Sequence, residues 1–275
     1  MFRTLLYAVV ATLSTLSVQG QAKPALSLWR LECGSFNTPL NSFSDTQAYP
    51  GQRRTFTDSC YLIRHGKDYL LFDTGFAPDL KGPLDPSKPL SFMGSKPIIQ
   101  QIAALGLVPA DIKIVSLSHN HSDQTGQAAD FPGATLLIGL PDFEALRTSP
   151  APFFTKPDQL RPWLSGSSPV DLVVGDRDIF GDGTVVFLAL PGHTSAHHGL
   201  LVRLQDLGPV LITGDAVHFR AQLDHGVPPK NANRADTLAS IDRLQRLAEH
   251  THAIVIIPHD PDDLKKLPTF PNEAH

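Results

Sequence analysis

Two histidines and one aspartate lie within a single short segment of this 275-residue chain. His119, His121 and Asp123 form the pattern H-x-H-x-D directly after the apolar run Ile112–Leu117. Two imidazoles and a carboxylate that are presented from one turn are suitable ligands for a divalent cation such as zinc. The segment therefore predicts a metal site.

Three further candidate ligands each follow an apolar run later in the chain. A lone histidine after a strand is usually a surface or core residue, and a lone Gly-Asp is usually a turn. Here all the candidates share one context, the end of a predicted strand, so they can converge if those ends share one edge of the sheets. They are His193, Asp215 and His259, which follow the runs 184–190, 210–213 and 253–257.

The elements that must position these residues come in two batches of strands, each followed by helices. Apolar patterning predicts helices from Pro97 to Gly106, near 143–146 and over 236–250, and it predicts a loop-rich insert at 148–171. The predicted strands are 26–31, 59–64, 69–72, 112–117, 135–138, 184–190, 200–204, 210–213 and 253–257. Because composition does not change along the chain, we expect one α/β domain, 23–275, with two sheets and helices outside them. No glycine-rich nucleotide motif follows any strand.

Charge and the N-terminal segment narrow the class of protein. Charged residues make up 18% of the chain and the net charge is −4, so we expect no nucleic-acid partner. Residues 1–22 are typical of a signal peptide, with Arg3, an apolar core over 5–16 and small residues for cleavage after Gly20 or Ala22. A membrane anchor is the alternative, but the apolar core is shorter than the ~20 residues that span a bilayer. We expect a periplasmic or secreted protein without a stable membrane anchor.

Whether the protein is exported affects the expected oxidation state of its two cysteines, Cys33 and Cys60. An oxidising compartment would allow them to form one disulfide. The alternative is a pair of buried thiols in neighbouring strands, and the sequence leaves both open.

With these motifs in view, the chain resembles the metallo-β-lactamase superfamily, and within it the N-acyl homoserine lactonases. The resemblance lies in Asp73-Thr74-Gly75, the 119–124 cluster, Gly192-His193-Thr194, Gly214-Asp215 and Pro258-His259. It implies an αβ/βα four-layer sandwich that holds two zinc ions. His119, His121 and His193 would hold the first ion, Asp123 and His259 the second, and Asp215 would bridge them. Asp73 would steady the metal loop without being a ligand.

Two positions depart from the pattern of the resembled family. The cluster usually ends in a histidine that binds the second metal, and this chain has Gln124 there. An amide oxygen is a weaker zinc donor, so we expect the second site to be looser or to select a different divalent metal, with Gln124 as an uncertain ligand. Many of these lactonases carry tyrosine three residues after the bridging aspartate, where this chain has His218, which could donate a hydrogen bond to the substrate.

The resemblance implies an exported, metal-dependent hydrolase that opens N-acyl homoserine lactones, the reaction of quorum quenching. A metal-bound hydroxide would attack the ester carbonyl, and Asp123 would pass a proton to the leaving oxygen. The binding partner would be a small lactone or ester. A homodimer is a possible assembly. The apolar segments 90–93 and 153–154, together with Trp163, could line a pocket for an acyl chain, although ordinary loop packing explains them equally well.

Other functions of the same superfamily remain as alternatives. A β-lactam hydrolase would share the first metal set but would not use a Gly-Asp bridge at Asp215. A glyoxalase-type thioesterase keeps that aspartate but usually adds a helical domain, and only 16 residues follow His259. Another esterase of the superfamily is also compatible. Outside the enzyme class, Gln124 suggests a metal-binding scaffold with a degenerate site.

Overall fold

The computed structural model describes residues 24–80, 82–226 and 233–275. The predicted signal peptide, 1–22, lies outside these ranges. Within them, no helix combines the length and the apolar character needed to cross a bilayer.

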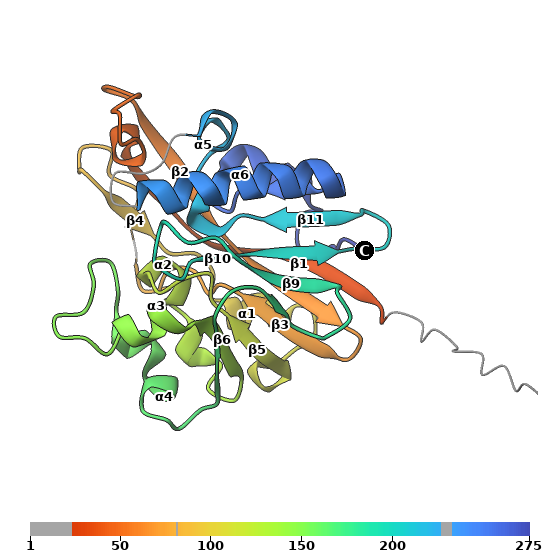
Figure 1. The fold of residues 1–275 in the computed structure, drawn as a ribbon. Coiled ribbons are helices and arrows are strands. Elements are labelled where there is room, and N and C mark those ends of the chain that lie inside the picture. The colour runs from red at the N-terminus through yellow and green to blue at the C-terminus, as the bar shows by residue number, and fades with distance from the viewer. Residues whose placement is uncertain (1–23, 81, 227–232) are drawn as a thin grey trace, which may run out of the picture.

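Two β-sheets form the centre of the molecule (Figure 1). The seven-stranded sheet has the order β4-β1-β2-β3-β5-β6-β7, and the five-stranded sheet has the order β12-β11-β10-β9-β8. The strands of the first sheet are β1 Leu26–Pro39, β2 Arg53–His65, β3 Asp68–Phe72, β4 Ser91–Met93, β5 Ile112–Ser116, β6 Thr135–Gly139 and β7 Val170–Val173. Those of the second sheet are β8 Arg177–Asp178, β9 Val185–Ala189, β10 His198–Arg203, β11 Pro209–Ile212 and β12 Ile254–Ile256.

Helices cover the outer face of each sheet, so the molecule has four layers (Figure 1). The short helices α1, α3 and α4 pack on the first sheet, and the long helix α6 packs on the second. The α-helices are α1 Ile98–Ala103, α2 Ser122–Thr125, α3 Leu140–Ala145, α4 Arg161–Leu164, α5 Arg220–His225 and α6 Arg234–Thr251. The predicted αβ/βα sandwich is confirmed.

The four layers of helices and sheets are separated by three layers of apolar side chains, and the alternation of side chains along each strand explains this arrangement. Side chains alternate between the faces of a strand, so Leu62 of β2 packs under the α1 layer while the adjacent Ile63 packs between the sheets. In the second sheet Leu200 faces the inner core and Leu201 faces α6. Each fully buried leucine or isoleucine stabilises the fold by about 1.5–3 kcal/mol.

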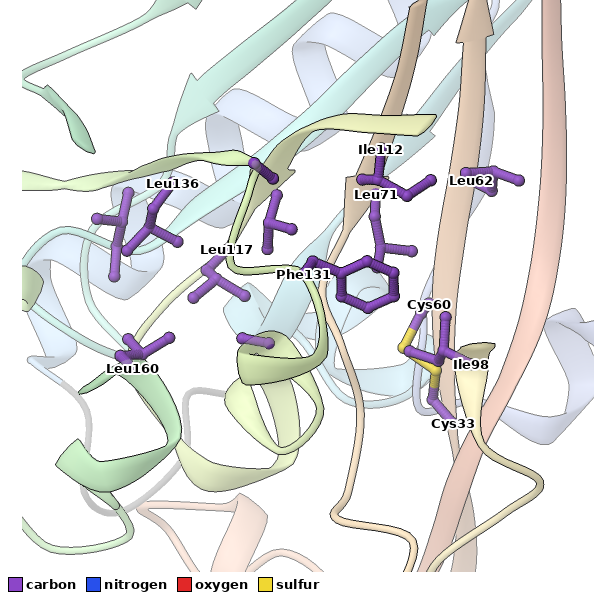
Figure 2. Packing of buried hydrophobic residues seen from close by; sticks show 14 of the residues in the cluster. Cys33, Cys60, Leu62, Leu71, Ile98, Ile112, Leu117, Phe131, Leu136 and Leu160 are labelled. Atoms are coloured by element: carbon purple, nitrogen blue, oxygen red, sulfur yellow. A yellow bond between two sulfur atoms is a disulfide. The ribbon is translucent and has the colours of Figure 1, made fainter. Parts of the chain in front are cut away.

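A disulfide joins Cys33 in β1 to Cys60 in β2, with their Cα atoms 5.8 Å apart. The two strands pair antiparallel, and a register shift lies between Glu32 and Gly34. Figure 2 shows the bond within the apolar layer, beside Ile98 of α1. Of the two states that the sequence allowed, the structure therefore has the bonded one.

Several elements differ from the sequence prediction. The first strand extends to Pro39 because it pairs with the whole of β2. The predicted loop-rich insert contains α4 and the start of β7, and the side chain of Trp163 in α4 is buried under the first sheet, where its Nε1–H donates to the Ala134 carbonyl at 3.0 Å. Of the two alternatives that the sequence left open for Trp163, pocket wall or ordinary packing, the structure has packing.

Candidate metal centre

The first ligand loop leaves the carboxyl end of β5 and is fixed by the segment after β3. Asp73 has a positive φ of 60°, which turns its carboxylate to accept the backbone N–H of Ser118 at 2.7 Å. The backbone N–H of Thr74 donates to the Gln124 carbonyl at 2.7 Å. Parallel pairing of β3 with β5 places these two strand ends together. The role expected for Asp73, support of the metal loop, agrees with this geometry.

The second set of candidate ligands comes from the ends of strands in the five-stranded sheet. His193 lies between β9 and β10, Asp215 follows β11, and His259 follows β12. The turn before Asp215 needs glycine at 214, where φ is +53° and an added Cβ would lie 2.6 Å from the ring of His197. The two sheets thus present their ligands toward one another from opposite halves of the chain.

The six residues expected as metal ligands converge on the carboxylate of Asp215. Its Oδ2 lies 3.6 Å from His193 Nε2 and 3.8 Å from His119 Nε2, and its Oδ1 lies 3.0 Å from His259 Nε2. His193 Nε2 lies 3.1 Å from His121 Nδ1. Two of the groups whose ligand atoms all lie within 4.8 Å of one another are His119, His121 and His193, and Asp123, Asp215 and His259. These are the two ligand sets implied by the sequence, with Asp215 between them.

The donor atoms fit a metal ion. His259 donates its Nδ1–H to the Thr57 carbonyl at 2.8 Å, so its Nε2 is free to face the cluster. The buried Nε2 atoms of His119 and His259 have no hydrogen-bond partner with suitable geometry among the described residues. Neighbouring donors on one tetrahedral zinc ion lie about 3.3 Å apart, since zinc bonds to nitrogen and oxygen are about 2.0–2.2 Å long. The observed separations of 3.0–3.8 Å are close to that value.

Electrostatics also favours a cation at this place. Burial lowers the pKa of His121 to about 4 and that of His119 well below its ordinary value, which keeps both imidazoles neutral. Burial alone would raise the pKa of Asp215, but the imidazoles of His259 and His119 hold it well below the usual range. Burial opposes a charge on His259, yet Asp215 raises its pKa to about 10. A metal ion bound by His259 and Asp215 would therefore compete with protonation of His259.

Two buried residues hold the ligands without belonging to the set. His197 donates from Nδ1 to the Leu190 carbonyl at 3.0 Å and accepts the backbone N–H of Asp215 on Nε2 at 2.8 Å. Asp142 in α3 accepts from Thr194 Oγ1 at 2.6 Å, and its backbone carbonyl accepts from Asn120 Nδ2 at 2.9 Å. No pattern in the sequence indicates a role for Asp142, because a single aspartate in a short helix has no distinguishing neighbours.

The two uncertain residues both lie beside Asp215. Gln124 is buried, its Nε2 lies 3.5 Å from Asp215 Oδ1, and its Oε1 has no hydrogen-bond partner among the described residues. His218 is buried with its Nε2 3.4 Å from Asp215 Oδ2. The structure therefore brings both positions to the cluster and leaves their roles as predictions.

A cavity of about 430 Å³ opens directly over the cluster. The polar groups of its floor are His121, Asp123, His193, Asp215, His218 and His259, and the remaining side chains are apolar except for Thr38 and Ser42. Phe153 is 83% exposed at its rim. The expected apolar segments 90–93 and 153–154 contribute to the wall, which consists of Phe36, Phe43, Pro89, Leu90, Phe92, Phe153 and Phe154.

This arrangement of strand-end ligands is matched by a known family. The family model of the metallo-beta-lactamase superfamily matches residues 54–259, which include all six ligand candidates. The chain belongs to the metallo-beta-lactamase superfamily. Membership implies a site for two zinc ions, and the relatives described next make the chain a metal-dependent hydrolase.

Individual proteins of the superfamily are similar over nearly the whole chain. The N-acyl homoserine lactonase AttM of Azorhizobium caulinodans is 33% identical over 267 residues, which cover 89% of this chain and 98% of the relative. An N-acyl homoserine lactonase of a Bacillus species is 25% identical over 230 residues, 81% of this chain and 88% of the relative. The resemblance to the lactonases that the sequence indicated is confirmed.

Solved structures agree with this fold. A quorum-quenching N-acyl homoserine lactone hydrolase superposes with a TM-score of 0.78 at 20% identity, over 92% of this chain and 99% of its own. Another, with N-hexanoyl-L-homoserine bound at its catalytic metal centre, gives a TM-score of 0.77 at 20% identity, over 92% of this chain and 100% of its own. At this identity the likeness establishes the fold alone.

Proposed function

We propose that the protein is an exported lactonase that hydrolyses N-acyl homoserine lactones. One observation carries the proposal: a single cavity has five of the six candidate metal ligands on its floor and mostly apolar side chains, five of them phenylalanines, in its wall. A lactone that carries an acyl chain needs both, a polar reacting end and an apolar tail. The names of the similar proteins support the same substrate class.

The ligand sets assign the residues that would hold two ions, for which zinc is the first candidate. His119, His121 and His193 would hold one, Asp123 and His259 the other, and Asp215 would contact both. When bound, such ions lower the pKa of a water molecule and polarise an ester carbonyl. The second set has only one imidazole, so we expect it to bind its ion more loosely than the first.

The side chains of the protein supply orientation and proton transfer. The aromatic wall would bind the acyl chain and exclude water from the floor of the cavity. Asp123 lies on that floor and is partly exposed to the cavity, so it can pass a proton to the oxygen that leaves when the ring opens. His197 and Asp142 would keep the ligand loops in register during turnover.

Export rests on the apolar segment near the N-terminus and on the disulfide. A disulfide between Cys33 and Cys60 is expected of a protein that folds in an oxidising compartment. Expression of the full chain in a bacterium, followed by mass spectrometry of periplasmic and culture fractions, should find mature protein that starts after Gly20 or Ala22. Retention of the intact chain in the cytoplasm would contradict export.

Parallel assays test the reaction. Zinc-loaded protein should open hexanoyl and decanoyl homoserine lactones, and turnover should stop after removal of metal by a chelator. A chromogenic β-lactam, a glutathione thioester and a simple aryl ester should react more slowly. Preference for the β-lactam or the thioester would assign another activity of the superfamily, and turnover of none would favour a metal-binding scaffold.

A further inference from the structure

We propose that His218 is a metal ligand: with His193 and Asp215, it holds the same cation as His119 and His121. The ligand atoms of His193, Asp215 and His218 form a third group in which all lie within 4.8 Å of one another. The inference rests on the proposed metal centre. It differs from the expectation that His218 is a hydrogen-bond donor to the substrate.

The distances around one oxygen atom carry the proposal. Three imidazole nitrogens surround Asp215 Oδ2, His218 Nε2 at 3.4 Å, His193 Nε2 at 3.6 Å and His119 Nε2 at 3.8 Å. These separations are too long for good N–H···O hydrogen bonds, which are mostly 2.9–3.0 Å. They are close to the distance of about 3.3 Å between neighbouring donors on one zinc ion. His218 therefore occupies the same kind of position as the candidate ligands His193 and His119.

The ring of His218 is held firmly by groups that leave its nitrogens free. Its backbone N–H donates to Gln222 Oε1 at 2.6 Å, and Gln222 Nε2 donates to the Phe43 carbonyl at 2.7 Å. The ring packs on Phe43 with centroids 4.3 Å apart and lies nearly parallel to His259 at 5.6 Å. This is the preorganisation that a ligand needs.

A comparison with a neighbouring histidine shows that the ring nitrogens of His218 lack the hydrogen bonds that fix the ring of His197. Both ring nitrogens of His197 are paired, at 3.0 and 2.8 Å. The Nδ1 of His218 is buried without a partner among the described residues, and its Nε2 faces only the cluster. A buried histidine in a purely structural role would have its ring nitrogens paired.

The expected consequence is that the first metal site has more nitrogen ligands than the second. The first ion would have four imidazoles and the Asp215 carboxylate, whereas Asp123, Asp215 and His259 remain for the other. A fuller set of protein ligands leaves less room for water on that ion, as in structural zinc sites. Titration of the apo-protein should accordingly show one tight and one looser event.

The test replaces His218 by phenylalanine, which keeps the ring against Phe43 and removes both nitrogens. Competition with a chromophoric chelator should show the tight zinc event weakened by about 10–100-fold or more, with the looser event unchanged. The absorption of the cobalt-loaded protein should change in intensity. The control is His225→Phe, which removes an imidazole from the exposed end of α5 and should leave both events as they are.

A second variant and a measurement on the unaltered chain guard against misfolding. Gln124→His should tighten only the looser event. In the wild-type cobalt protein, paramagnetic NMR should show shifted imidazole signals from His218 as well as from the other four histidine ligands. If His218→Phe changes neither of the two zinc-binding events nor the cobalt spectrum, the inference is overturned. The role that then remains for His218 is a hydrogen bond to the substrate. A wild-type protein that binds no metal would instead refute the proposed function.

Discussion

Asp142 connects the two ligand loops although it touches no ligand atom. Its carboxylate accepts from Thr194 Oγ1 at 2.6 Å and from the backbone N–H of Ala196 at 3.1 Å, on the loop that carries His193. Its backbone carbonyl accepts from Asn120, which lies between His119 and His121. One residue of α3 thus holds both loops, the His193 loop through its carboxylate and the His119–His121 loop through its backbone carbonyl.

Removal of this carboxylate should destabilise the fold and loosen the site. Asp142→Ala leaves a buried backbone N–H without an acceptor, which costs about 1–3 kcal/mol. We expect a fall of that size in the free energy of unfolding by urea, and weaker zinc binding. Asp142→Asn keeps one acceptor oxygen and should lose less. Equal stability of both variants and the wild type would contradict the connecting role.

At the scale of elements, the loop between α3 and α4 brings an exposed aromatic ring to the rim of the cavity. The carbonyl of Phe154 accepts the backbone N–H of Ser122 at 2.8 Å, which attaches the loop to the metal segment. Phe153, next in the chain, is 83% exposed and stacks edge-on against Phe154. The loop is positioned to contact the distal part of a long substrate.

This placement predicts selectivity for chain length. Phe153→Ser should raise KM for decanoyl homoserine lactone by about 5–30-fold, the equivalent of 1–2 kcal/mol of apolar burial, with kcat little changed. A butanoyl substrate should be affected much less. Val174→Ser is the control, because Val174 is 78% exposed and does not line the cavity. An equal effect on both substrates would exclude this contact.

The disulfide acts between β1 and β2, whose pairing builds the longest part of the first sheet. The bond closes a loop with a sequence separation of 27, which in the chain-entropy model stabilises a protein by about 3–4 kcal/mol. The double variant Cys33→Ala/Cys60→Ala should unfold at lower urea concentration by that free energy. Wild-type protein in reductant should behave like the variant; a variant as stable as oxidised wild type would refute the estimate.

The elements that could be predicted from the sequence are those with enough apolar residues to show a period. β2, β3, β5 and α6 were expected near their observed positions, and the six ligand candidates followed because they end such strands. β4, β7 and β8 were missed, since strands of two to four residues carry no clear period. The place of Trp163 stayed open between a pocket wall and ordinary packing, because apolar content alone does not distinguish the two. Whether Cys33 and Cys60 are bonded depended on strand pairing, which composition does not reveal.

At the scale of the whole molecule, the metal centre lies where the two sheets meet. His119, His121 and Asp123 come from the first sheet, and His193, Asp215 and His259 come from the second. A cation held by both would link the halves of the fold, in addition to the apolar layer between them.

Removal of metal should therefore lower the stability of the entire domain. A ligand that binds only the folded state, at 100 times its Kd, stabilises it by about 2.7 kcal/mol. For a chain of this size we expect the melting temperature to fall by about 5–10 °C after chelation, measured by scanning calorimetry. Re-addition of zinc should restore it. An unchanged melting temperature, with metal loss verified by elemental analysis, would show that the sheets hold together without the ions.

The backbone of Leu28 pairs with that of Ala274 through two hydrogen bonds of 2.9 Å, so residues near 24 and 275 are neighbours in space (Figure 1). A linker of a few residues could join them, at about 3.5 Å per residue. New termini opened in the exposed turn at Gly181 would then give a circular permutant in which His193, Asp215 and His259 are synthesised before His119 and His121. We expect this permutant to bind metal, because the site depends on where the strands end in space and not on the order of its ligands along the polypeptide.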